Sequence, residues 1–167
     1  LFSIVTVLLL STLFVSAQSS FKLKYDNSAV YAGIEVGSKG VKMSILEIGR
    51  GAQKSGAFNI LKDTSVNSDF ISFSPQTFQS TVNGFTALYN AAVKDYNIPS
   101  EKIYTVISSG VKGQAEKDNK ESWIKNLIDS FKTKINEPVR EVDVIDVIQE
   151  ARLSHIGIVP ESRRYST

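Results

Sequence analysis

The sequence contains no cysteine and only one histidine, and these absences exclude several kinds of chemistry. Without cysteine there is no disulfide framework, no thiolate metal cluster, no cysteine nucleophile and no lipid-modified cysteine. A single histidine, His155, leaves little room for a zinc site or a catalytic triad, and we assign it no role. Excess charge of either sign is also missing, because 19 basic residues face 17 acidic ones. We therefore expect neither a nucleic-acid surface nor a surface for anionic membranes.

What is present fits a globular protein of one domain or at most two, with 42% apolar residues in 167. Residues 1–17 carry no charge, and 11 of the first 15 are apolar. This run is short for a membrane span, and it closes on Val15-Ser16-Ala17 with small side chains where a signal peptidase reads. We predict a signal peptide over residues 1–17, cleaved after Ala17, and a Ser-rich linker over 18–29. An uncleaved amino-terminal anchor is the alternative.

In the first part of the mature chain, apolar residues recur with the period of two that is typical of β-strands. Residues 30–36 and 41–48 alternate in hydrophobicity around a Gly-Ser-Lys-Gly turn, and 58–61 follow as a third strand. A polar loop is expected over 62–69. These three strands are close enough along the chain to form an antiparallel meander.

Helices and strands then alternate. Apolar residues three and four apart predict helices over residues 76–96 and 123–135, and a third over 149–158. Between them, 102–108 and 139–145 read as strands that need helical crossovers and so pair in parallel. The predicted order is β-β-β-α-β-α-β-α, an α/β domain with a mixed sheet.

The first hairpin turn is a candidate anion site. Glu35 at the end of a strand is followed by Gly37, Ser38, Lys39 and Gly40. Glycine permits a tight turn whose backbone N–H groups point at an anion, and the carboxylate could hold a divalent cation nearby. An ordinary hairpin is the alternative interpretation.

Two further candidates follow later strands. Ser108, Ser109, Gly110 and Lys112 come at the carboxyl end of the fourth strand, where ligands bind in open α/β sheets, although a solvated loop has the same composition. Glu150 opens the last helix and could act as a base on a water molecule. A carboxylate in the first turn is also favoured by the helix dipole alone.

Taken together, three segments resemble the first half of the exopolyphosphatase and guanosine pentaphosphate phosphatase (Ppx/GppA) family, within the actin-like ATPase superfold. They are GIEVGSKGVKMSILEI, VISSGVKGQAEKDN and VDVIDVIQEARLSHIGI. In this sequence Glu35 replaces the family's Asp, Lys39 its Asn and Lys112 its Arg, and a Gly of the third segment is missing. The resemblance implies a ribonuclease H-like lobe over residues 30–159.

By this resemblance Glu150 is the catalytic base, Glu35 holds Mg²⁺ or another divalent cation, and six residues bind phosphate: Gly37, Ser38, Lys39, Ser108, Ser109 and Lys112. The substrate is expected to be polyphosphate or a nucleotide phosphate tail. Residues 160–167 are expected to begin the connection to a second lobe, so that this chain alone is inactive. A homodimer of the complete protein is left open.

Three alternatives remain. Within the same superfold, an apyrase-like nucleoside triphosphate hydrolase shares the strand and Gly-Ser hairpin. A non-catalytic nucleotide-binding or scaffold protein is the second, and a function that has drifted while the fold stayed is the third. Cleavage of residues 1–17 would place the protein in the periplasm or outside the cell, with no membrane attachment.

Overall fold

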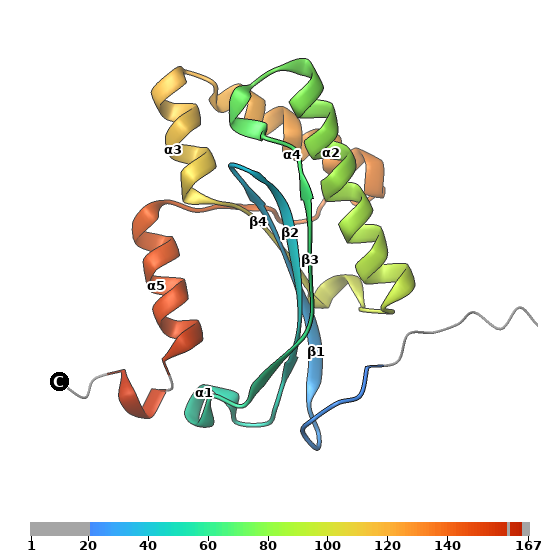
Figure 1. Ribbon diagram of the computed structural model, residues 1–167, viewed down its shortest axis with the longest axis vertical. Coiled ribbons are helices and arrows are strands. Elements are labelled where there is room, and N and C mark those ends of the chain that lie inside the picture. The colour runs from blue at the N-terminus through green and yellow to red at the C-terminus, as the bar shows by residue number, and fades with distance from the viewer. Residues whose placement is uncertain (1–20, 160, 165–167) are drawn as a thin grey trace, which may run out of the picture.

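The computed structural model describes residues 21–159 and 161–164, and it shows a mixed five-stranded sheet with helices on both sides (Figure 1). The strand order across the sheet is β3-β2-β1-β4-β5. In Figure 1 α2 lies to the right of the strands and α5 to the left. The predicted signal peptide over residues 1–17 lies outside the described residues, so it stays a prediction. No helix in the described part of the chain is long and apolar enough to cross a bilayer.

The strands are β1 (Ala29–Gly37), β2 (Gly40–Ile48), β3 (Phe58–Asn67), β4 (Ile103–Ile107) and β5 (Asp143–Val144). The helices are α1 (Ala52–Ser55), α2 (Pro75–Asn90), α3 (Ser109–Asp118), α4 (Glu121–Ile135) and α5 (Val147–Ile158). A π-helical turn, Ala91–Asp95, extends α2, and short 3₁₀ turns lie at Phe70–Ser72, Ser100–Lys102 and Glu161–Arg163.

The sheet confirms the predicted α/β class and the pairing of its strands. β1 pairs antiparallel with β2 and β2 with β3, whereas β4 lies parallel to both β1 and β5. Alternate residues of the first two strands are buried on the face covered by α2: Ala32, Ile34, Val36, Val41, Met43 and Ile45. The period of two that predicted these strands therefore also sets which face forms the core.

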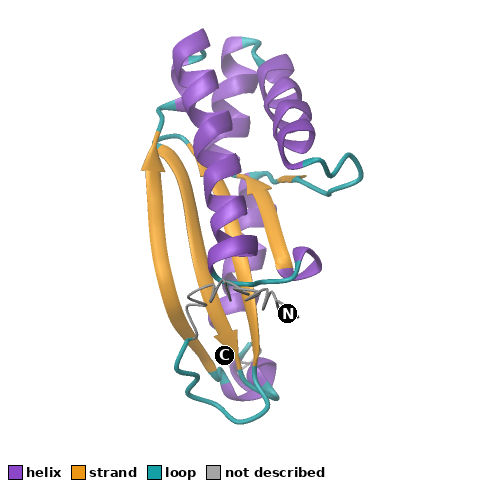
Figure 2. Ribbon diagram, turned by 90° about the vertical axis from the view of Figure 1, so that its right-hand side faces the viewer, coloured by secondary structure: helices purple, strands orange, loops and turns teal. Residues whose placement is uncertain are grey.

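The core forms where α2 and α4 pack together over this face, and Figure 2 shows the long α2 lying along the sheet. The rings of Phe85 and Phe131 stack at 3.7 Å, and Tyr89 meets Phe131 edge-on at 5.7 Å. Both phenylalanines are fully buried. Burial of each such side chain stabilises the fold by about 1.5–3 kcal/mol.

The structure differs from the prediction in four places, two additional helices and two strand lengths. A complete helix, α3, follows β4 where a loop was expected, and the four-residue α1 interrupts the meander. β3 continues to Asn67 instead of ending at Leu61, because the polar second half pairs with β2 at the sheet edge and needs no burial on its outer face. β5 has two residues in place of seven, since only Asp143 and Val144 reach β4.

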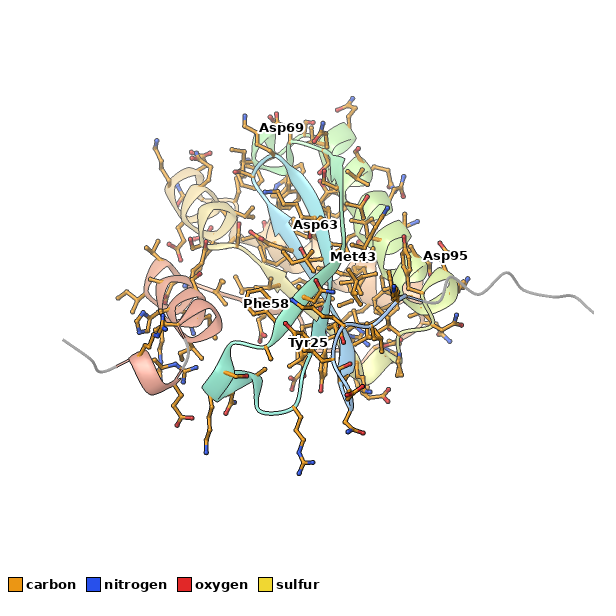
Figure 3. The ribbon with its side chains drawn as sticks, turned by 60° about the horizontal axis from the view of Figure 1, so that its bottom comes forward. Tyr25, Met43, Phe58, Asp63, Asp69 and Asp95 are labelled. Carbon is orange, nitrogen blue, oxygen red and sulfur yellow. The ribbon has the colours of Figure 1, made fainter. Side chains whose placement is uncertain are left out.

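Residues 21–28, expected as part of a linker, are held against the sheet by Glu47 of β2. The Glu47 carboxylate is fully buried and accepts hydrogen bonds from the backbone N–H groups of Lys24, at 2.8 and 3.0 Å, and Tyr25, at 2.7 Å. It also accepts from the Ser28 hydroxyl at 2.7 Å. The Tyr25 hydroxyl donates to the Phe58 carbonyl, and both residues lie at the same end of the sheet (Figure 3).

Acid is expected to weaken this attachment. Burial alone raises the pKa of the Glu47 carboxyl, but the N–H groups of Lys24 and Tyr25 and the side chains of Ser28 and Asn59 outweigh it and lower the pKa from 4.5 to about 2. Because the folded pKa is the lower one, its stabilisation is complete above the unfolded value and is lost as the pH falls toward 2. We expect the free energy of unfolding to decline over this range, as measured by chemical denaturation.

Glu47→Gln should be less stable at neutral pH and should lose this part of the pH dependence. Glu141→Gln removes an exposed carboxylate and serves as the control. Identical pH profiles for the wild type and Glu47→Gln would show that the buried carboxylate contributes nothing to stability.

Candidate functional site

One cavity of about 360 Å³ collects residues from the β1–β2 turn, the end of β4 and the start of α5. These three parts of the chain lie in the upper half of Figure 1. The cavity is lined by Glu35, Gly37, Ser38, Lys39, Gly40, Lys42, Ser65, Val66, Asn67, Ser108, Ser109, Gly110 and Glu150. It is therefore built from segments more than 100 residues apart in sequence, brought together by the parallel pairing of β1 with β4 and of β4 with β5.

The first wall is the β1–β2 turn, a two-residue loop of Ser38 and Lys39 closed by the pair Gly37 and Gly40. Gly40 has a φ of 155°, and a Cβ there would lie 2.1 Å from the Val66 carbonyl oxygen. Any other residue would push the turn away from β3. The turn is thus fixed at a position where its backbone borders the cavity.

The second wall is the start of α3. Ser108 is almost fully buried, and its N–H donates to the Val36 carbonyl at 3.0 Å, which ties the helix start to β1. Ser109 and Gly110 are the first residues of the helix, whose early N–H groups lack partners within the helix. Such a helix start has a partial positive charge and favours a negatively charged group in front of it.

The third wall is Glu150, in the first turn of α5. Asp146 and Gln149 form a capping box that fixes this turn. The Glu150 carboxylate reaches across to α3, where its Oε2 accepts a hydrogen bond from the Ser109 N–H at 3.1 Å. Hydrogen bonds from the side chain and backbone of Ser109 lower the pKa of the Glu150 carboxyl, so it is ionised at neutral pH.

The structure therefore brings seven of the eight predicted site residues to one cavity: Glu35, Gly37, Ser38, Lys39, Ser108, Ser109 and Glu150. The eighth, Lys112, is not among its lining residues. Its ammonium lies 3.8 Å from the Glu116 carboxylate, one helical turn further along α3. What each residue binds stays a prediction.

Four lining residues were not predicted from the sequence: Lys42, Ser65, Val66 and Asn67. Lys42 is opposite Glu35 in the β1–β2 register, so it lies on the same face of the sheet. Lys42 stands between the buried residues Val41 and Met43, so the period of two along the strand would have placed its side chain on the face opposite the core. Asn67 pairs with Gly40 at the end of β3 and could not be found while that strand was expected to end at Leu61.

The cavity offers carboxylate oxygens, the kind of donor that a small, hard cation prefers. Within residues 21–159 and 161–164 no three or more His, Cys, Asp or Glu side chains are placed so that they could hold a metal ion together. Two carboxylates, of Glu35 and Glu150, do line the cavity together. Mg²⁺ is usually bound through one or two carboxylates, with water and substrate phosphates completing its coordination, so this donor set is compatible with Mg²⁺ and phosphate together.

Neither a protein-family model nor a curated protein matches the chain. Solved structures do. A crystal structure of the Aquifex aeolicus member of the Ppx/GppA protein family matches with a TM-score of 0.55 at 18% identity, over 77% of this chain and 38% of that one. An exopolyphosphatase-like protein matches with a TM-score of 0.54 at 14% identity, over 78% of this chain and 37% of that one.

The chain thus spans less than two fifths of the length of these structures, and the identity is low, so the likeness concerns the fold. The mixed sheet and its strand pairing agree with the predicted α/β class. The described part of this chain has a fold similar to that of the matching part of the Ppx/GppA structure.

Proposed function

We propose that the chain forms one wall of a phosphoanhydride hydrolase site, which releases the terminal phosphate from polyphosphate or from a nucleotide phosphate tail. The observation that carries the proposal is the cavity in which Glu150 shares a surface with the β1–β2 turn and the start of α3. A phosphate placed there meets the backbone of the turn, the N-terminus of α3 and the ammonium groups of Lys39 and Lys42.

In this proposal Glu150 orients and deprotonates the attacking water. The lowered pKa of Glu150 ensures that the carboxylate is available at neutral pH, although it also makes a weaker base. Its bond to the Ser109 N–H occupies an amide that a phosphate oxygen could use, so phosphate binding there would displace the carboxylate toward the cavity. Mg²⁺, held by Glu35, would neutralise charge on the phosphates.

The proposed activity belongs to a longer protein. The matched structures extend well beyond the part that this chain covers, and we propose that the additional length supplies the opposite wall of the site. The 167-residue chain is then expected to bind phosphate without turnover. Export, by way of the predicted signal peptide, is part of the same proposal and fits hydrolysis of phosphates outside the cytoplasm.

Binding of tripolyphosphate to the chain tests this proposal. Lys39→Met should weaken binding by roughly tenfold, because the Lys39 ammonium lines the cavity and a hydrogen bond to a charged group contributes about 1.5–3 kcal/mol. Lys117→Met, on the exposed side of α3, is the matched control and should bind like the wild type. Both are measured by titration calorimetry at one fixed salt concentration.

Three results would count against the proposal. Absence of tripolyphosphate binding, or equal weakening by both lysine substitutions, would mean that the cavity is not the anion site. Phosphate release by the chain alone at the rate of a longer parent protein would contradict the need for a second wall.

A second candidate function, a non-catalytic nucleotide-binding or scaffold protein, is favoured by one observation. The Glu150 carboxylate caps α3 through the Ser109 N–H, which is a complete structural role in itself. An apyrase-like hydrolase uses the same cavity and differs in substrate, so comparing nucleoside triphosphates with polyphosphate separates it from the first proposal.

A further inference from the structure

A second cavity, of about 710 Å³, adjoins the candidate site. Lys39 and Asn67 line both cavities, so the two are neighbours at the β1–β2 turn. The second cavity is completed by residues that follow β3 and begin α2: Ser68, Asp69, Gln76, Thr77 and Ser80. Asp69 lies at the far end of the sheet from Tyr25 (Figure 3).

The floor of this cavity is held in place by hydrogen bonds. The Ser68 N–H donates to the Lys39 carbonyl at 3.2 Å, which connects the two cavities through the backbone. The fully buried Thr81 hydroxyl lies 2.8 Å from the Ser68 hydroxyl and 2.7 Å from the Thr77 carbonyl oxygen. Asp69 accepts a hydrogen bond from the Ser72 hydroxyl, which fixes its carboxylate. These hydrogen bonds hold Ser68 and Asp69 in place at the edge of the cavity.

Its chemistry differs from that of the phosphate cavity. The described lining residues are hydroxyl and amide side chains with one cation, Lys39, and one carboxylate, Asp69, and none of them is aromatic. The start of α2 also faces this cavity, but Asp69 already supplies negative charge beside it. A further phosphate would lie against that carboxylate, whereas hydroxyl groups can donate to it.

Resting on the proposed function, we propose that this second cavity binds the ribose of a phosphate-bearing nucleotide, with the Asp69 carboxylate accepting hydrogen bonds from its hydroxyls. In dinucleotide-binding Rossmann folds a carboxylate accepts hydrogen bonds from ribose hydroxyls in the same way. The phosphate tail extends past Lys39 into the neighbouring cavity. Linear polyphosphate lacks the hydroxyls that this cavity is suited to bind.

Three probes with equal phosphate number test the assignment: ATP, 2′,3′-dideoxy-ATP and tripolyphosphate. ATP and its dideoxy analogue share the base and the phosphates, so their difference isolates the ribose hydroxyls. We expect ATP to bind the 167-residue chain roughly tenfold more tightly than dideoxy-ATP, the usual size of a hydrogen bond to a charged group. Tripolyphosphate should also bind more weakly than ATP.

Asp69→Asn is the decisive variant. Asp69 has a φ of 48°, a conformation that asparagine also adopts, so the backbone should be retained. The variant should reduce the ratio between ATP and dideoxy-ATP toward one and leave tripolyphosphate affinity unchanged or slightly improved. Asp129→Asn, on an exposed face of α4, should leave all three affinities unchanged.

The outcomes separate the two proposals. Equal binding of ATP and dideoxy-ATP by the wild type, or the same ratio in Asp69→Asn, overturns the ribose assignment and leaves the phosphate cavity standing. Failure of all three probes to bind overturns both. Loss of tripolyphosphate binding in Asp69→Asn would also overturn the assignment, since it would place Asp69 in support of the phosphate cavity.

Discussion

Arg140→Met is expected to lower the free energy of unfolding by about 2–3 kcal/mol, among the largest effects in this fold. The Arg140 guanidinium is buried and donates to the Glu137 carboxylate at 2.7 Å and to the Ile103 carbonyl at 2.9 Å. It also donates to the Ser100 carbonyl and to the Tyr89 hydroxyl, both at 2.9 Å. One side chain thus joins α2, the start of β4 and the segment between α4 and β5.

The size of this effect follows from what the substitution leaves behind. Methionine keeps the length of the side chain but removes all five donors, so the Ile103 and Ser100 carbonyls and the Glu137 carboxylate each lose one hydrogen bond. The Glu137 carboxylate keeps its hydrogen bonds from the hydroxyls of Tyr89 and Ser100. Breaking a fully buried ion pair costs about 3–5 kcal/mol. The Glu137 side chain is 31% exposed, so water recovers part of that cost.

Urea denaturation at neutral pH measures the change. Arg140→Lys retains the charge and loses the planar fork, so its stability should lie between those of the wild type and Arg140→Met. Burial raises the pKa of the Glu137 carboxyl, whereas its hydrogen bonds with Tyr89 and Arg140 lower it, and the net shift is downward. A loss in Arg140→Met below about 0.5 kcal/mol, as for a surface pair, would contradict this structural role.

Most of the sheet and two of its helices could be predicted from the sequence because each buries one regular face. In β1 and β2 the alternating apolar residues are the buried ones, and in α4 Ile124, Leu127 and Phe131 are buried at spacings of three and four. A regular spacing of apolar residues indicates a strand or helix with one buried face, and each of these elements has one buried face. The turn that ends in Gly40 was marked by its glycines, and that glycine is required.

α3 could not be predicted in the same way. Its sequence contains Gly110 and Gly113, and of its residues only Val111 and Ala115 are buried. Two buried residues one helical turn apart are too few to establish a helical period of apolar residues, and glycine disfavours a helix. The helix forms because its start is tied to β1 by Ser108 and its buried residues pack with the core, information that comes from tertiary structure.

Site residues that belong to one short motif could be predicted from the sequence. Site residues that reach the cavity only through the register of paired strands could not. Ser38 and Lys39 belong to a recognisable turn, and Glu150 follows from the family resemblance. Asn67 reaches the cavity only because β3 continues to the end of β2, and its polar sequence gave no sign of that. Sequence patterns thus located the separate segments, and the parallel crossover placed them together.

Glu150→Gln in a complete protein is expected to lower kcat by roughly 10²–10⁴-fold, the usual contribution of a general base. Glutamine retains an oxygen that can accept the Ser109 N–H, so the cap of α3 should remain while the base is lost. Substrate affinity should be retained or improved, because the substitution removes one negative charge from the cavity. Steady-state phosphate release and equilibrium binding measure the two effects separately.

The lowered pKa of Glu150 also leads to a prediction about how kcat/KM depends on pH. Because hydrogen bonds with Ser109 lower the pKa of the Glu150 carboxyl, the acid limb of the kcat/KM profile should lie below that of an unperturbed glutamate. Glu121→Gln, on an exposed part of α4, is the control and should leave both rate and profile unchanged. If hydrolysis by Glu150→Gln equals that of the wild type, Glu150 only caps α3 and another group must activate the water. If hydrolysis is absent from the wild type while nucleotides still bind, the non-catalytic function accounts for the same cavity, since the anion contacts do not depend on a base.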